Sequence, residues 1–181
     1  MELLFILFLI YKFIHGTFKA ETATRFSLII IPIYSAIMMI LAIKYEYSIL
    51  TIIATFALSF IGIIIGIFQA YGAEVSISDN LNKYHVPKIT IKRGLNYLIG
   101  WIIIFILGLL IKLLFEQNIN HKEIFGELST ELLRDLSKIF FFTDHSTWFM
   151  WILNTSSSWT YDTYLFLKYP TLRKYVLLRK K

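Results

Sequence analysis

Three stretches of this sequence are apolar over about twenty residues at a time. Residues 26–43 and 49–71 contain no charged side chain, and residues 95–115 contain only Lys112. An α-helix needs about 20 apolar residues to cross the ~30 Å hydrocarbon core of a bilayer. Each stretch is therefore predicted to be a transmembrane helix. The whole chain is 57% hydrophobic, whereas soluble domains average roughly 45–50%, so the composition also favours a membrane protein.

Two weaker segments extend the prediction to five spans. Residues 3–18 are short and contain Lys12, and residues 148–168 have a polar middle between aromatic ends. The distribution of Lys and Arg supports counting both segments as spans, because cytoplasmic loops of membrane proteins are enriched in these residues. The five spans, numbered in chain order, are residues 3–18, 26–43, 49–71, 95–115 and 148–168. In this arrangement the segments after spans 1, 3 and 5, together with the adjoining span ends, lie on one side of the membrane. They carry 13 of the 18 Lys and Arg residues.

The expected fold is therefore an all-α membrane protein with five transmembrane helices in one multi-pass domain over residues 1–181. The positive-inside rule places its N-terminus outside and its C-terminus in the cytoplasm. Heavy use of Ile and Lys suggests a bacterial source, and hence the bacterial plasma membrane.

The segment 74–92, between spans 3 and 4, has the pattern of strands. Apolar residues alternate with polar ones over 74–78 and again over 88–92, and a turn-forming run, residues 79–82, lies between them. Alternation of period 2 on both sides of a turn predicts a β-hairpin. We expect this cytoplasmic hairpin to lay its apolar face on the inner leaflet or on the helix ends and to clasp spans 3 and 4. A docking strand for a partner is the alternative.

Span 3 carries a stripe of small residues that includes Ser59, Gly62 and Gly66. Small residues let helix backbones approach closely, and this close packing drives helix association in lipid. We expect the stripe to pack inside the chain, with span 4 as its partner through Gly100. The alternative is that it forms the contact face of a dimer.

Span 5 carries polar residues Asn154, Ser158 and Asp162 at intervals of four, on one face of the helix. Polar side chains within membrane spans usually face the bundle interior and often mark function. We expect Asp162 to lie near the inner interface and to pair with Arg25 or Arg93, which precede spans 2 and 4. A substrate or proton path is the alternative.

An amphipathic outer helix is predicted for residues 121–140, before span 5. Its polar face carries acidic residues at intervals of four: Glu123, Glu127, Glu131 and Asp135. A solvated polar face explains such a row, and contact with a divalent cation or a cationic peptide is the alternative.

Several function classes are excluded by what the sequence lacks. The chain contains no cysteine, which excludes disulfides, thiol catalysis and Cys-ligated metals. Its four histidines are isolated, and no nucleotide-binding, hydrolase or metalloprotease motif is present. We therefore expect no catalytic residues, no cofactor and no metal site. The basic residues lie in short loops between apolar runs, so nucleic acid is not an expected partner.

The layout resembles the CcdC-like family of small bacterial integral-membrane proteins. The matching features are Arg25 with Pro32, Gly62 with Gly66, the run Lys92-Arg93-Gly94 that ends KITIKRG, and Trp101. The resemblance covers roughly residues 1–170 and implies an architecture more than an activity. With no cysteine, this chain cannot itself relay thiols in cytochrome biogenesis.

The sequence favours a non-catalytic accessory or regulatory subunit of another membrane system. Beyond the lipid bilayer, the expected partner is another membrane protein or a second copy of the chain. One alternative is a self-protection protein against a membrane-active peptide or toxin, which the acidic outer row suggests. The other is a small transport component whose path is lined by Asp162 and Asn154.

Overall fold

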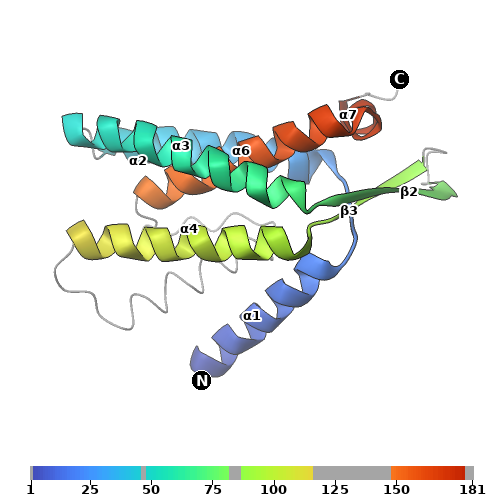
Figure 1. The fold of residues 1–181 in the computed structure, drawn as a ribbon, viewed down its shortest axis with the longest axis horizontal. Coiled ribbons are helices and arrows are strands. Elements are labelled where there is room, and N and C mark those ends of the chain that lie inside the picture. Colours follow the sequence, from blue (N-terminus) through green and yellow to red (C-terminus); the bar gives the residue numbers. More distant parts are fainter. Residues whose placement is uncertain (1, 46–47, 82–86, 116–147, 178–181) are drawn as a thin grey trace.

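The computed structural model describes residues 2–45, 48–81, 87–115 and 148–177, and these residues are mostly helical. Its elements, labelled in Figure 1, are α1 (Glu2–Phe18), β1 (Glu21–Thr22), the π-helix η1 (Phe26–Ile30), α2 (Ile31–Tyr45), α3 (Ile49–Tyr71), β2 (Glu74–Leu81), β3 (Pro87–Lys92), α4 (Gly94–Phe115), α6 (Trp148–Lys168) and α7 (Pro170–Leu177). The predicted outer helix, with its acidic row Glu123, Glu127, Glu131 and Asp135, lies outside the described residues.

Within the described residues, three helices are long and apolar enough to cross a membrane. They are Phe26–Lys44, Ile49–Tyr71 and Gly94–Lys112, and they correspond to predicted spans 2, 3 and 4. The helices predicted for spans 1 and 5 also form, as α1 and α6. However, the apolar part of α1 is shorter, Leu7–Phe18, and α6 does not meet the same measure of apolarity.

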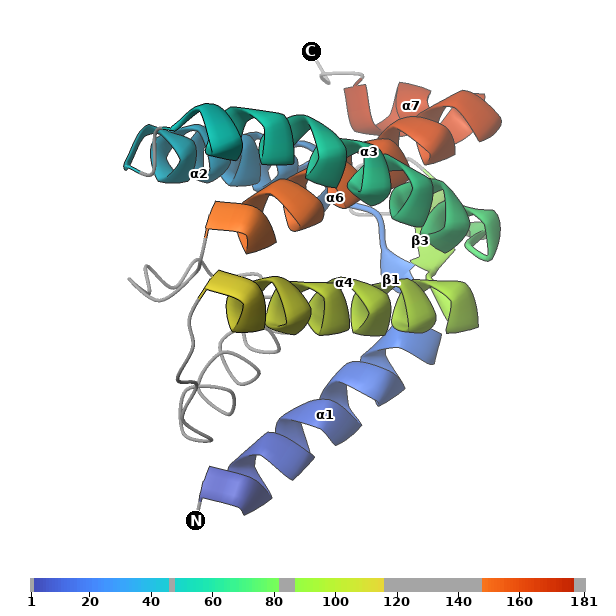
Figure 2. The ribbon, with the colours of Figure 1, turned by 60° about the vertical axis from the view of Figure 1, so that its left-hand side comes forward.

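Helix α6 lies in the middle of the bundle. It packs on α3, its most extensive neighbour, and also on α2 and α4. Figure 2 shows α2 and α3 on one side of α6 and α4 on the other, while α1 crosses α4 obliquely. As a result α6 is largely buried, and Ile152 and Leu153 have no exposed surface. The least apolar of these helices is thus the one that the others cover.

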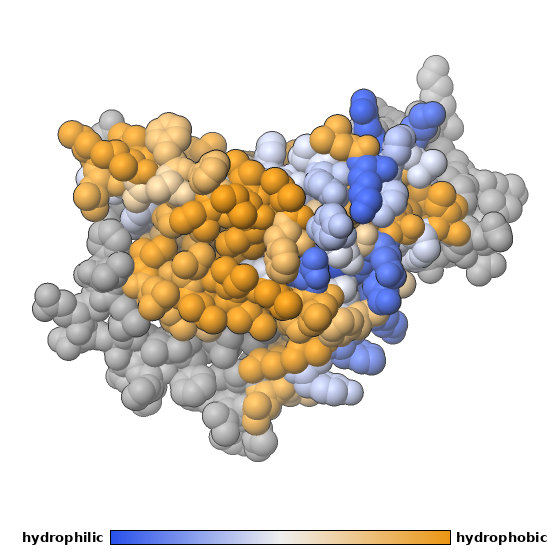
Figure 3. All heavy atoms as spheres, viewed as in Figure 1, coloured by the Kyte–Doolittle hydropathy of each residue, from blue (hydrophilic) through white to orange (hydrophobic). Residues whose placement is uncertain are grey.

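The outer faces of α2, α3 and α4 are apolar and exposed. Large side chains such as Ile37, Phe60 and Ile102 point outward, and Figure 3 shows a broad apolar surface that gives way to a hydrophilic band near the sheet. Soluble monomers rarely expose a continuous apolar patch beyond a few hundred Å². The exterior therefore suits the hydrocarbon core of a membrane, in agreement with the prediction of a membrane protein from the sequence.

The predicted hairpin is confirmed, and it has a third strand. Strands β2 and β3 pair antiparallel, with Val75 opposite Ile91. The two-residue strand β1 adds to the other edge of β3, so the order is β1-β3-β2. The turn prediction is wrong for residues 79–81, because β2 continues to Leu81. Pro87 is the first residue of β3, a position where its missing N–H is tolerated.

One face of the sheet packs on the ends of the helices, as expected. Ile89 and Ile91 are buried in a cluster that includes Leu165 of α6. Helix α7, which was not expected, completes this cluster with Leu172 and Val176, both almost fully buried. The sheet is therefore anchored to protein rather than resting on lipid alone.

Helices α2 and α6 are joined by side-chain hydrogen bonds to backbone carbonyls. The Trp159 indole N–H donates to the Pro32 carbonyl at 2.8 Å, and the Thr155 hydroxyl donates to the Ser35 carbonyl at 3.1 Å. The π-helix η1 ends at Ile30, two residues before Pro32. Both hydrogen bonds end on carbonyls near the start of α2, so they fasten the start of this helix to α6.

Candidate functional site

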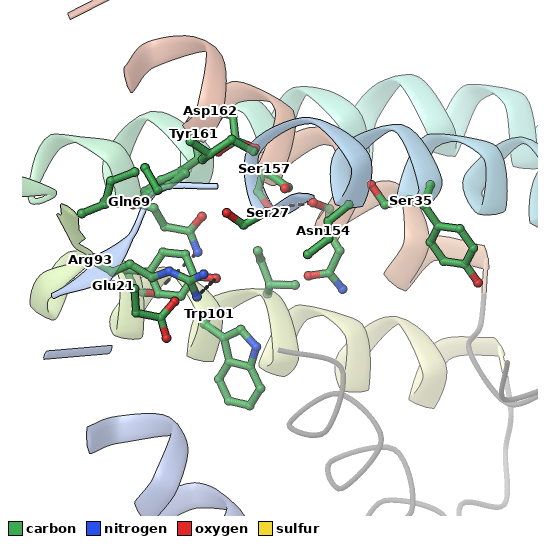
Figure 4. A pocket seen from close by; sticks show the side chains of 18 of the residues that line it. Glu21, Ser27, Ser35, Gln69, Arg93, Trp101, Asn154, Ser157, Tyr161 and Asp162 are labelled. Carbon is green, nitrogen blue, oxygen red and sulfur yellow. Dashed lines mark hydrogen bonds between the residues drawn. The ribbon is translucent and has the colours of Figure 1, made fainter. Parts of the chain in front are cut away.

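A cavity of about 150 Å³ lies between α2, α4 and α6, at the end of the bundle that carries the sheet. Its position follows from the packing, because α2 and α4 each pack on α6, with little contact between them in the described part of the chain. Helix α6 therefore provides the floor of the cavity. Figure 4 shows polar side chains from several elements that converge on this space.

The polar stripe of α6 faces this cavity. Asn154, Ser158 and Asp162, predicted from their spacing to share one helix face, all line it. Ser157 and Tyr161 of the same helix line it as well. Since α6 is covered by other helices, these polar groups are kept from the apolar exterior. The structure thus adds to the predicted helix face the cavity that its three residues line.

Asp162 is buried, with 7% of its surface exposed. Among the described residues, none forms a hydrogen bond or an ion pair with its carboxylate. The neighbouring Tyr161 hydroxyl is buried too and has no hydrogen-bond partner in the described part of the chain. Buried polar groups in proteins are nearly always hydrogen-bonded. Asp162 and Tyr161 are neighbours in the chain, and both lie at the cavity wall.

Arg93, one of the two predicted partners of Asp162, lines the same cavity. Its guanidinium lies over the Tyr97 ring, 4.6 Å from the centroid, and donates to the Tyr97 hydroxyl at 3.1 Å. Its charge is close enough to act on the buried Asp162 carboxylate. Arg25, the other predicted partner, is exposed next to η1 and does not line the cavity.

Glu21 of β1 is a further charged residue in the cavity wall, and sequence reasoning missed it. Figure 4 shows it beside Arg93, whereas Asp162 lies on the α6 side. The pairing of Glu21 with Ile91 in the sheet brings it there. A two-residue strand has no periodicity to detect, so no signal in the sequence could have placed Glu21. Among the described lining residues, two carboxylates thus face one guanidinium.

The small-residue stripe of α3 packs inside the chain, but its predicted partner is wrong. A Cβ on Gly62 would lie 2.7 Å from the Ser156 Cβ, and a Cβ on Gly66 would lie 2.8 Å from the Thr160 Cβ, both on α6. Half-buried Ser59 lies one turn before Gly62.

Only the end of α3 meets span 4 in the expected way, where Gly100 of α4 contacts the Gln69 side chain. Nearby, the Gln69 side-chain N–H donates to the Tyr97 carbonyl at 3.5 Å. Gln69 also lines the cavity, so this corner joins the helix interface to the site.

Within the described residues, no group of three or more His, Asp and Glu side chains could hold a metal ion. Comparison with protein families, with curated proteins and with solved structures finds no match for this chain. The resemblance to the CcdC-like family therefore stays a prediction.

Proposed function

We propose that this is a five-helix protein of the bacterial plasma membrane that binds a small polar solute in the α2–α4–α6 cavity, as a small transport component. The observation that carries this proposal is the buried residue Asp162, which lines the cavity and whose carboxylate forms no hydrogen bond or ion pair with the described residues. Ionisable groups at such positions in membrane proteins mark substrate or ion pathways.

Two features support five spans with the N-terminus outside. The five long helices run alternately toward and away from the sheet in chain order (Figure 1). Basic residues gather at the sheet end of the described chain: Lys19, Arg25, Lys92, Arg93, Lys168, Arg173 and Lys174. Lys44 and Lys112 lie toward the opposite ends of their helices. An excess of Lys and Arg marks the cytoplasmic side, so the cavity, which lies toward the sheet end, would belong to the cytoplasmic half of the protein.

The burial of α6 supports its assignment as the fifth span. A transmembrane helix must be strongly apolar where it touches lipid, but α6 touches mainly α2, α3 and α4. Its polar residues then cost little, because they face protein and the cavity. Asp162 lies six residues before Lys168 at the end of α6, which places it about 9 Å from that end at 1.5 Å per residue.

We favour transport over a purely accessory role because most of the surfaces expected to contact a partner face the interior of the chain. The small-residue stripe, with Gly62 and Gly66, is covered by α6. The polar stripe of α6 faces the cavity. Of the expected contact surfaces that the structure describes, the hairpin keeps an outer edge, that of β2. The self-protection alternative depends on the acidic row, which lies outside the described residues.

Single cysteines offer a direct test, because the natural chain has none. We expect Ser158→Cys, in the cavity wall, to react with a charged thiol reagent added to inside-out vesicles. Reaction requires the thiolate and therefore water. Phe60→Cys is the matched control, since Phe60 is 65% exposed on the outer face of α3 and lies at a similar distance from the sheet end of its helix. It should stay unreactive in lipid. If Ser158→Cys is as unreactive as Phe60→Cys, no solute reaches the cavity and the proposal fails.

A further inference from the structure

The charges of the cavity indicate the class of its solute. Resting on the function proposed above, we infer that the ligand is a small organic amine whose ammonium group is held by Asp162.

The volume of the cavity sets the size of the ligand. A cavity of about 150 Å³ equals the engineered protein cavity of about 150 Å³ that holds one benzene molecule. Drug-sized ligands occupy pockets of roughly 300–1,000 Å³. The site therefore fits a short amine or a lipid headgroup, and a large amphipathic compound would not be enclosed.

The charge balance favours a cation. Arg93 and Glu21 lie side by side at one end of the cavity (Figure 4), so their opposite charges offset each other. By formal charge, the carboxylates of Glu21 and Asp162 then outnumber the Arg93 guanidinium by one in the described lining. Burying a carboxylate without a partner is costly, and an ammonium group would relieve that cost. An anionic ligand would instead bring a second negative charge to Asp162.

The polar groups around Asp162 match the donors of an ammonium ion. A primary ammonium carries three N–H donors. Asp162 can accept one, and the Tyr161 hydroxyl, which is buried without a partner in the described chain, can accept another. Ser158 lies one helical turn away on the same wall. Trp101 and Trp151 also line the cavity, and indole rings attract organic cations.

Two sources could supply this chemistry. One is a free short amine from the cytoplasm, and the other is the ethanolamine headgroup of phosphatidylethanolamine in the inner leaflet. Both present a primary ammonium on a short chain, so the experiment has one arm for each source.

In the first arm, the thermal unfolding of the purified protein in detergent is measured with added ethanolamine hydrochloride. We expect the melting temperature to rise with the logarithm of ethanolamine concentration, as for any ligand of the folded state. Glycerol, sodium acetate and sodium chloride at matched ionic strength should leave it unchanged. An equal rise with any of these three would overturn the inference, because binding would then not require an ammonium group.

In the second arm, the protein is placed in nanodiscs of phosphatidylethanolamine or of phosphatidylglycerol. A higher melting temperature in phosphatidylethanolamine alone, without an effect of free ethanolamine in detergent, supports the amine and assigns it to the lipid. The absence of an ammonium effect in both arms refutes the inference.

Asp162→Asn is the decisive variant, and Glu74→Gln is its control. Both remove one carboxylate charge, but Glu74 is exposed on β2 and paired with Lys92 at 3.4 Å. Asp162→Asn should lose the ethanolamine or phosphatidylethanolamine effect, and Glu74→Gln should keep it. An undiminished effect in Asp162→Asn would contradict the assignment. The wild-type comparison decides the ligand class even if Asp162→Asn fails to fold.

Labelling of Ser158→Cys separates this inference from the proposed function. If the cysteine reacts and neither arm shows an ammonium effect, the cavity still admits solute and only the amine is refuted. If the cysteine does not react, the proposed function itself fails. When the inference holds, the ammonium ligand found in these arms should also slow the labelling.

Discussion

Gly66 of α3 lies against the backbone of α6, and its replacement by alanine is predicted to weaken the fold. A Cβ at this position would overlap the Ser157 carbonyl oxygen and would lie 2.8 Å from the Thr160 Cβ. Both groups are fixed by the α6 backbone, so neither can rotate away. Ordinary contact with a Cβ begins at 3.4 Å. To bring the Thr160 contact alone to 3.4 Å, the two helices must part by about 0.6 Å at this point.

The magnitude follows from two opposing effects. Overpacking of a well-packed interface costs about 1–3 kcal/mol, and a gap of about 0.5–1 Å forfeits a quarter to a half of the dispersion energy of the separated atoms. Alanine also favours the helix over glycine, by somewhat less than about 1 kcal/mol. We expect Gly66→Ala to lower the free energy of unfolding by a net amount of about 1–2 kcal/mol.

Gly16→Ala is the matched control for this experiment. Gly16 is also helical, in α1, but a Cβ there would meet nothing within 4 Å. The substitution should be neutral or stabilising, since only the helix propensity changes. The measurement is a titration of the folded protein with sodium dodecyl sulfate in mixed micelles, followed by tryptophan fluorescence. If Gly66→Ala is as stable as Gly16→Ala, the close contact between α3 and α6 does not exist as described.

Two further predictions concern the sheet and the orientation. Ile89→Ala should cost about 2–5 kcal/mol of unfolding free energy, because a buried Ile side chain leaves a cavity. Ile77→Ala should cost under about 1 kcal/mol, since Ile77, directly opposite in the sheet, is 52% exposed; equal losses in the same titration would refute the burial of β3. In intact cells, a membrane-impermeant maleimide should label Lys44→Cys, and should label Lys174→Cys only after lysis. The reverse pattern would invert the orientation.

The bounds of the long helices could be predicted well from the sequence. Predicted spans 49–71 and 148–168 coincide with α3 and α6. At α3 the local signals agree with the apolar pattern, because the Ser48 hydroxyl caps its start by accepting from the Thr51 N–H at 3.0 Å, and Gly72 follows its end. Both features act within one helical turn, so they are visible in a single sequence.

The partner of each helix face could not be predicted in the same way. A stripe of small residues shows which face will pack closely, but α4 and α6 both offered small residues to Gly62 and Gly66. In the structure both glycines pack on α6, with Ser156 and Thr160 at the contact. The pairing of α3 with α6 depends on the burial of α6 as a whole, which a stripe on α3 alone does not indicate. Hydropathy measures how well a helix suits lipid, and it therefore ranked the most buried helix, α6, as one of the weakest spans.

Short elements were missed because they carry little pattern. Strand β1 has two residues, and it pairs with β3, about seventy positions later in the chain. Helix α7 reads as a basic tail, although Pro170 at its start is a known helix signal. Leu172 and Val176, four residues apart, bury one face of α7. Both elements exist mainly through tertiary contacts.

The sheet and the cavity depend on one another, and this gives the hairpin segment a role beyond holding α3 and α4 together. Strand β3 carries Ile91 into the cavity wall and ends next to Arg93, while its pairing with β1 brings Glu21 to the same place. Tyr161 of α6 packs in the cluster that contains Ile91 and also lines the cavity. Loss of the sheet would separate Glu21 from Arg93 and expose this wall. The charge pattern around Asp162 is therefore a property of the sheet as much as of α6.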